Sequence, residues 1–134
     1  TPEGASDPQA WIELGNAALV LKDKANLRAA GARTNALAPD RYEGYLFRAA
    51  FLNLDGQKEQ SLVALDNAIE RCGRATTPFI LRATVLTDLG RKEEAVHTLA
   101  AALERNPTDP ATLAYKQSLE PAFAEVDTSG AGNE

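Results

Sequence analysis

The large apolar residues of this chain recur at a fixed interval of 34 residues, and this period constrains the fold more than any other feature. Shifting the sequence by that interval superimposes Trp11, Tyr45, Phe79 and Leu113. The same shift aligns further small and apolar positions: Gly15 with Ala49 and Ala83, Leu52 with Leu86, Gly56 with Gly90, and Ala68 with Ala102. Four anchors in one register indicate a solenoid, in which each unit buries its apolar face only against its neighbours.

Each interval has the pattern of two helices joined by a tight turn. In the third unit, the apolar runs Phe79–Leu89 and Ala95–Leu103 flank a break at residues 90–92, and the second run ends at Asn106 before Pro107. A residue before proline is displaced from the α region, so a helix stops there. The sequence therefore predicts a chain of helical hairpins.

A large residue, a small residue, a second large residue, glycine, alanine and proline, in this order and at this period, resemble the tetratricopeptide repeat. The resemblance covers about residues 8–119 and is fullest in the third unit. It departs in the first unit, where Lys22 replaces the glycine and residues 26–38 lack the expected large apolar side chain. The resemblance implies an all-α fold, a right-handed α-solenoid of antiparallel helix hairpins.

The length of 134 residues suits one domain of three such units. We expect a flexible lead-in over residues 1–7, repeats over 8–41, 42–75 and 76–109, a capping helix over 110–120, and a flexible tail over 121–134. Aspartate followed by proline occurs at Asp7-Pro8 and at Asp109-Pro110, three periods apart. Aspartate caps a helix and proline suits its first position, so both pairs mark helix starts.

The expected helices are Pro8–Leu21, Leu27–Leu37, Arg41–Leu54, Glu59–Cys72, Pro78–Leu89, Lys92–Arg105 and Pro110–Leu119. The second is the weakest because Gly31 lies inside it, and glycine costs up to about 1 kcal/mol relative to alanine in a helix. We expect another helix to pack closely against Gly31. Gly73 should supply a left-handed C-cap.

The charge pattern limits the classes of partner. The net charge is −5 and the isoelectric point is about 4.9, with acidic and basic residues interspersed, so nucleic acid and anionic membranes are not expected as partners. No run approaches the roughly 18 apolar residues of a membrane span, so no direct membrane insertion is expected. The chain has no methionine, which predicts that Thr1 is not a native start. Cytoplasmic and periplasmic or exported locations both stay open.

The residues offer no recognisable catalytic set. The single Cys72 excludes an intramolecular disulfide and a cysteine-based metal cluster, and the single His97 has no suitably framed nucleophile. No glycine-rich phosphate loop or metal-ligand spacing occurs. We therefore expect no enzyme, no cofactor and no metal site.

The resemblance implies that the first helix of each hairpin lines a concave groove. The groove positions in this sequence are Ile12, Asn16, Leu19, Leu46, Phe47, Ala50, Asn53, Ile80, Leu81, Thr84 and Thr87. Seven of the eleven are apolar and none is charged, which favours an apolar helix or an extended peptide of a partner protein. Asn53 and Thr84 would hydrogen-bond its backbone. The alternative at each position, and first at Leu46 and Leu81, is packing between repeats.

Some repeats of the resembled family clamp a C-terminal carboxylate with two lysines, two asparagines and an arginine. Those positions are held here by Ile12, Asn16, Phe47, Thr77 and Leu81. Only Asn16 remains a donor of the required kind, so a carboxylate clamp is not expected.

The function predicted from these features is a non-catalytic scaffold that binds a protein or peptide segment in its groove. One alternative is a module for homo-oligomerisation or structural assembly, in which the partner is a second copy of the chain. Another is the accessory repeat region of a longer enzyme or membrane-anchored protein.

Arg48 and Arg82 lie one period apart, each directly before a small residue of the pattern. A structural arginine would be paired with an acid on a facing helix, for which Asp66 and Glu70 are candidates. The alternative is a ladder of arginines that binds anions. The first reading is favoured because a partly buried arginine without a partner is costly.

Overall fold

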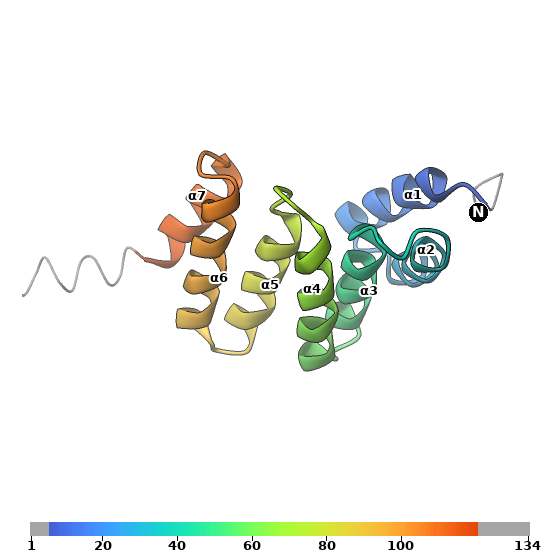
Figure 1. Ribbon diagram of the computed structural model, residues 1–134. Helices are drawn as coiled ribbons and strands as arrows, with labels where there is room; N and C mark the ends of the chain where they lie inside the picture. Colours follow the sequence, from blue (N-terminus) through green and yellow to red (C-terminus); the bar gives the residue numbers. More distant parts are fainter. Residues whose placement is uncertain (1–5, 121–134) are drawn as a thin grey trace, which may run out of the picture.

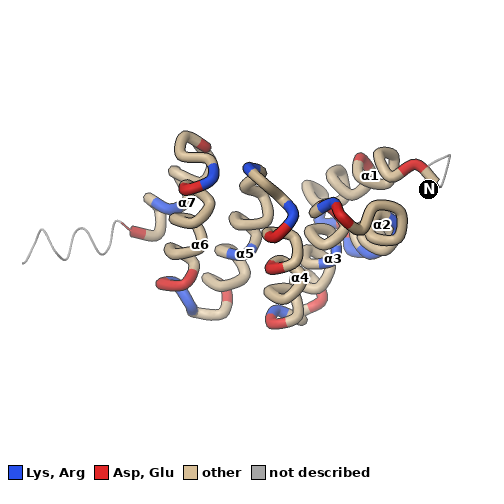
Figure 2. Tube along the Cα trace, in the orientation of Figure 1, with Lys and Arg blue, Asp and Glu red and all other residues tan. Residues whose placement is uncertain are grey.

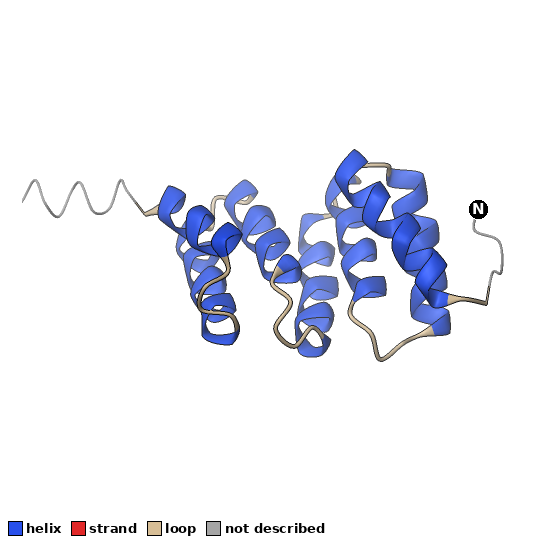
Figure 3. Ribbon diagram, turned by 90° about the horizontal axis from the view of Figure 1, so that it is seen from above, coloured by secondary structure: helices blue, strands red, loops and turns tan. Residues whose placement is uncertain are grey.

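The computed structural model describes residues 6–120, which form seven helices in a single stack (Figure 1). The helices are α1 (Pro8–Leu21), α2 (Lys24–Leu37), α3 (Glu43–Leu54), α4 (Lys58–Arg71), α5 (Thr77–Asp88), α6 (Lys92–Arg105) and α7 (Pro110–Leu119). Residues 6–120 contain no strand, and successive helices are joined by short loops (Figure 3). The expected all-α solenoid of helical hairpins is confirmed.

The stack is not straight. Helices α3 to α6 lie side by side with parallel axes, whereas α1 runs across them and α2 is seen end-on in the same view (Figure 1). Of the expected flexible ends, residues 1–5 and 121–134 lie outside the described residues. None of the described helices is both long enough and apolar enough to cross a membrane.

Most helix ends fall within one or two residues of the expected positions, the usual uncertainty of helix boundaries. The exception is α2, which begins at Lys24 and not at Leu27. Asp23 caps it, because its carboxylate accepts hydrogen bonds from the backbone nitrogen and the side-chain amide of Asn26, at 3.2 and 2.7 Å. The expected turn over residues 22–26 was therefore too long.

The turn inside each hairpin has one geometry throughout the stack. Lys22, Gly56 and Gly90, each 34 residues apart, have φ values of 55°, 80° and 78°. The residue after each donates its backbone N–H to the carbonyl five residues back: Asp23 to Ala18, Gln57 to Leu52, and Arg91 to Leu86. The first repeat thus makes the same turn as the others, although it places a lysine in the left-handed conformation that favours glycine.

Glycines set the spacing of the first three helices. A Cβ atom on Gly15 would lie 2.2 Å from the ring of Phe47, and one on Gly31 would lie 3.1 Å from the backbone nitrogen of Arg48. The close approach expected at Gly31 is therefore confirmed, and α3 is the helix that makes it. Gly44 leaves comparable room for Asn35. Without these Cβ atoms, α1, α2 and α3 pack backbone to backbone or backbone to ring.

The aromatic anchor of each repeat is covered by an arginine from the second helix. The guanidinium carbon lies 4.5 to 5.7 Å from the ring centroid in the three pairs: Arg33 with Trp11, Arg71 with Tyr45, and Arg105 with Phe79. Such cation–π contacts contribute about 0.5–1 kcal/mol at exposed sites. The fourth anchor, Leu113 on α7, is 38% exposed because no second helix of the described chain follows to cover it.

Candidate functional site

A shallow apolar depression lies on the face formed by the first helices of the hairpins. It measures about 230 Å³ and is lined by Leu19 of α1, Leu46 of α3, and Thr77, Ile80, Leu81 and Thr84 of α5. Five of these six residues belong to the eleven predicted groove positions. The fold therefore brings residues from three repeats to one hollow, and no charged side chain lines it.

Several predicted groove residues lie in the core and not on the surface. Ile12, Phe47 and Ala50 are buried, and the Phe47 side chain is completely covered. The ring of Phe47 occupies the space that Gly15 leaves open on α1. For these three residues the alternative of packing between repeats describes the structure, and they cannot touch a partner unless the repeats separate. Leu46 is also buried, yet its side chain forms part of the depression.

The polar groove residues are largely occupied by the protein itself. Thr84 Oγ1 donates to the carbonyl of Ile80 at 2.9 Å and accepts from the Tyr115 hydroxyl at 3.3 Å. Thr87 Oγ1 likewise donates to its own helix, at the carbonyl of Ala83. The predicted donation by Thr84 to a bound peptide would thus compete with an existing hydrogen bond.

Asn53 and Asn16 complete the set. The side-chain oxygen of Asn53 accepts from Lys58 Nζ at 2.6 Å, which leaves its amide N–H groups for a partner. Asn16 is exposed on α1 and does not line the depression.

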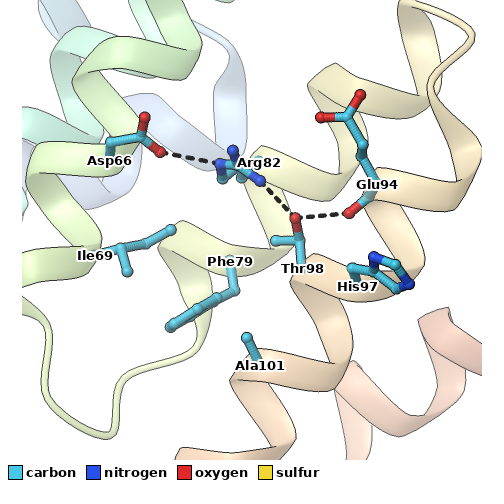
Figure 4. Close-up of a pocket in the computed structure, with 8 residues that line it drawn as sticks. All are labelled: Asp66, Ile69, Phe79, Arg82, Glu94, His97, Thr98 and Ala101. Carbon is cyan, nitrogen blue, oxygen red and sulfur yellow. Dashed lines mark hydrogen bonds and ion pairs between the residues drawn. The ribbon is translucent and has the colours of Figure 1, made fainter.

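A second kind of hollow lies between the second helices of neighbouring repeats. In Figure 4, Arg82 of α5 points into a hollow of about 400 Å³ between α4 and α6. Its Nε donates to Asp66 Oδ1 at 3.1 Å, and its Nη1 donates to Thr98 Oγ1 at 2.6 Å. The expected pairing of Arg82 with an acid on a facing helix is confirmed, and Asp66 is that acid. Glu70 instead lies near Arg71, at 3.8 Å.

An equivalent hollow of about 490 Å³ occurs one repeat earlier, between α2 and α4. Arg48 lines it at the position that corresponds to Arg82, but no carboxylate does. The expected structural ion pair is therefore wrong for Arg48, because none of the described side chains pairs with it. The 34-residue alignment could have shown this, since it places Ala32 opposite Asp66.

The two residues with the most reactive side-chain types do not form a reactive centre. Cys72 is buried, and this burial raises the pKa of its thiol, although the nearby Arg105 acts in the opposite direction. A protonated, covered thiol is a poor nucleophile. His97 lies at the rim of the Arg82 hollow (Figure 4), and no group of three His, Cys, Asp or Glu residues within 6–120 could hold a metal ion.

Comparison with known proteins bears on the fold. No family model matches the sequence, and no curated protein matches it either. Among solved structures, the chain is similar to the Arabidopsis OM64 TPR domain, with a TM-score of 0.71 and 20% sequence identity over 87% of this chain and 96% of that one. At this identity the likeness concerns the fold alone. Repeat period, hairpin geometry and structural similarity together show that this chain has the fold of a tetratricopeptide repeat domain.

Proposed function

We propose that the chain is a protein-interaction scaffold that holds an apolar anchor of a partner polypeptide in the depression between α1, α3 and α5. The observation that carries this proposal is an uncharged hollow built by three successive repeats, with Leu19, Ile80 and Leu81 partly exposed around it. A partly exposed cluster of this kind gains free energy when a partner covers it, at roughly 25 cal/mol per Å² of apolar surface.

The size of the depression limits what enters it. Its volume of about 230 Å³ is below the range of roughly 300–1,000 Å³ typical of small-molecule pockets. It suits one or two aliphatic or aromatic side chains from a helix or an extended segment. The absence of a lysine or arginine from its lining favours an apolar residue over a terminal carboxylate.

Adjacent residues of α1 provide a matched pair of variants. Leu19 lines the depression, whereas Val20 is 82% exposed and points away from it. Random peptides would be selected on the wild-type protein by phage display, and their affinities measured by fluorescence polarisation. Leu19→Asp should weaken the selected peptides by at least about tenfold, because a carboxylate would have to be desolvated in the complex. Val20→Asp should leave their affinities within about twofold of the wild type.

The result that contradicts the proposal is equally definite. Peptides that bind Leu19→Asp and a second variant, Leu81→Glu, as tightly as the wild type would place the binding surface elsewhere. Unchanged far-UV circular dichroism and melting temperature in both variants would show that the comparison concerns binding and not folding.

A second candidate function is self-association, favoured by an exposed apolar edge. Val20 and Leu54 occupy the same position in successive repeats, and Leu21 beside them is 74% exposed. Contiguous exposed apolar residues often mark an interface. Sedimentation velocity at several concentrations tests it: a dimer that Val20→Asp dissociates would support this candidate, and a monomer at high micromolar concentration would remove it.

A further inference from the structure

The two hollows between second helices are the same site in successive repeats, built with different side chains. Shifting by one period superimposes Tyr45 on Phe79 and Arg48 on Arg82. We call them the Arg48 hollow and the Arg82 hollow. Because the backbone geometry repeats, differences between them come from the side chains that surround each arginine.

The Arg82 hollow supplies the needs of its own arginine. The guanidinium is bound on one side by the carboxylate of Asp66 and on the other by the hydroxyl of Thr98, as Figure 4 shows. That hydroxyl in turn donates to the carbonyl of Glu94 at 2.9 Å. This arginine is therefore a satisfied structural group, with its charge compensated within the fold.

The Arg48 hollow lacks every one of these groups. Ala32 stands in place of Asp66, Ala64 in place of Thr98, and Gln60 in place of Glu94. Arg48 is exposed, and it makes no ion pair or hydrogen bond with any residue of the part of the chain that the structure describes. The repeat thus keeps the cation and omits all the groups that would compensate it.

A second arginine strengthens the positive charge at this place. Arg28 of α2 and Arg48 of α3 both line a hollow of about 300 Å³ that adjoins the first, and no carboxylate lines either one. The Arg28 guanidinium rests on the Phe51 ring, 5.5 Å from its centroid. The neighbouring acid, Asp55, is already bound by Lys24 at 2.6 Å and by a side-chain amide.

The position of Arg48 is fixed by the closest helix contact in the stack. Its backbone nitrogen lies where Gly31 of α2 has no side chain, so α2 and α3 meet there without a spacer. The apolar part of the hollow is formed by Tyr45, Leu52 and Val63, of which Val63 is 63% exposed. A cation held beside open apolar surface matches a carboxylate next to an apolar side chain.

We infer that the Arg48 hollow binds an aspartate or glutamate side chain of a partner polypeptide, with an apolar neighbour of that residue covering Val63. Gln60, which lines both hollows and makes no side-chain hydrogen bond within residues 6–120, would bind the backbone of that segment. This surface lies between the second helices and is separate from the depression of the proposed function. It therefore gives the scaffold a second point of contact.

The wider charge pattern favours a short acidic segment over a polyanion. The chain carries a net charge of −5, and its acidic residues are spread along the stack (Figure 2). Nucleic acid and anionic membranes bind through many cations at once, whereas this site offers two. A single carboxylate is recognised locally by one or two guanidinium groups and needs no extended basic surface.

The test uses two short peptides that differ in one group. The probes are acetyl-Ala-Leu-Glu-Leu-Ala-amide and the same peptide with glutamine, titrated at low salt into the labelled protein. Proton–nitrogen NMR would follow the backbone and the arginine Nε signals. The glutamate peptide should shift the Nε signals of Arg48 and Arg28 and bind at least about tenfold more tightly than the glutamine peptide, the usual effect of a charged hydrogen-bond partner.

Three variants make the assignment specific. Arg48→Gln should weaken the glutamate peptide about tenfold or more, whereas the matched change Arg82→Gln should leave its affinity unchanged. Ala32→Asp, at an exposed position of α2, restores the acid found in the next repeat and should weaken binding to the same extent as Arg48→Gln.

Three results would overturn the inference. Equal binding of the glutamate and glutamine peptides would remove the charge recognition, and full affinity in Ala32→Asp would place the contact away from Arg48. Inorganic phosphate that shifts the same signals more tightly than the peptide, at equal ionic strength, would make this a general anion site. Failure of these variants leaves the depression of the proposed function unaffected, because Leu19→Asp tests that surface separately.

Discussion

Gly15→Ala should destabilise the protein, although alanine is the better helix former. Intrinsic propensity alone would make this change favourable by up to about 1 kcal/mol in the interior of α1. The new Cβ, however, would lie 2.2, 2.4 and 2.5 Å from three atoms of the Phe47 ring. Ordinary carbon contacts are about 3.5–4.0 Å, so the ring would have to move by more than 1 Å.

Phe47 has nowhere to go, because its side chain is 0% exposed at the centre of the core. Overpacking of this kind typically costs 1–3 kcal/mol, and a displacement this large belongs at the upper end. After subtraction of the propensity gain, we expect a net loss of about 1–2 kcal/mol in the free energy of unfolding. For a chain of this size, the melting temperature should fall by several degrees.

Urea unfolding followed by circular dichroism would measure the change. Ala17→Gly, on the exposed face of the same helix, is the control and should cost about 1 kcal/mol through propensity alone. The double variant Gly15→Ala/Phe47→Leu should be more stable than the sum of the two single changes predicts, by roughly 0.5–3 kcal/mol, because the smaller side chain relieves the contact. A more stable Gly15→Ala protein would refute the close packing of α1 on α3.

Three further predictions concern the turns, caps and ion pairs. Lys22→Gly should stabilise the protein by about 1 kcal/mol in urea unfolding, because Lys22 has a φ of 55° that a side chain disfavours; a loss of stability would contradict the turn geometry. Asp109 has a lowered pKa, chiefly through hydrogen bonds from the Thr112 hydroxyl and backbone. Its contribution is therefore present above the unfolded pKa of about 3.9 and lost on further acidification, so between pH 6 and pH 2 the wild type should lose more stability than Asp109→Asn. Equal acid sensitivity of the two proteins would exclude the cap. Asp66→Ala should cost less than about 1 kcal/mol in thermal unfolding, as is usual for an exposed ion pair, and should give the glutamate peptide a second, weaker site at Arg82; unchanged Arg82 NMR signals would count against the equivalence of the two hollows.

The candidate surfaces were only partly predictable from sequence. The resemblance named eleven positions for one groove, and the fold brings five of them to the depression. Phe47 was misplaced because a helical pattern shows which face a side chain is on, but not whether a facing glycine leaves space to bury it. The different fates of Arg48 and Arg82 depend on helices that are distant in sequence, although the alignment of Ala32 with Asp66 already carried the signal.

The sequence by itself determined the helical hairpins, because their causes are local. Capping aspartates, prolines at first positions, glycine turns and a regular apolar spacing act over a few residues, and they repeat every 34 residues. Helix α2 shows where this ended: its glycine and alanines give a weak local signal, and α2 is stabilised by the close contact of Gly31 with α3. Only the tertiary structure decided which apolar residues are buried and which arginine lacks a partner. Burial and charge compensation are properties of neighbours in space, which a one-dimensional pattern does not specify.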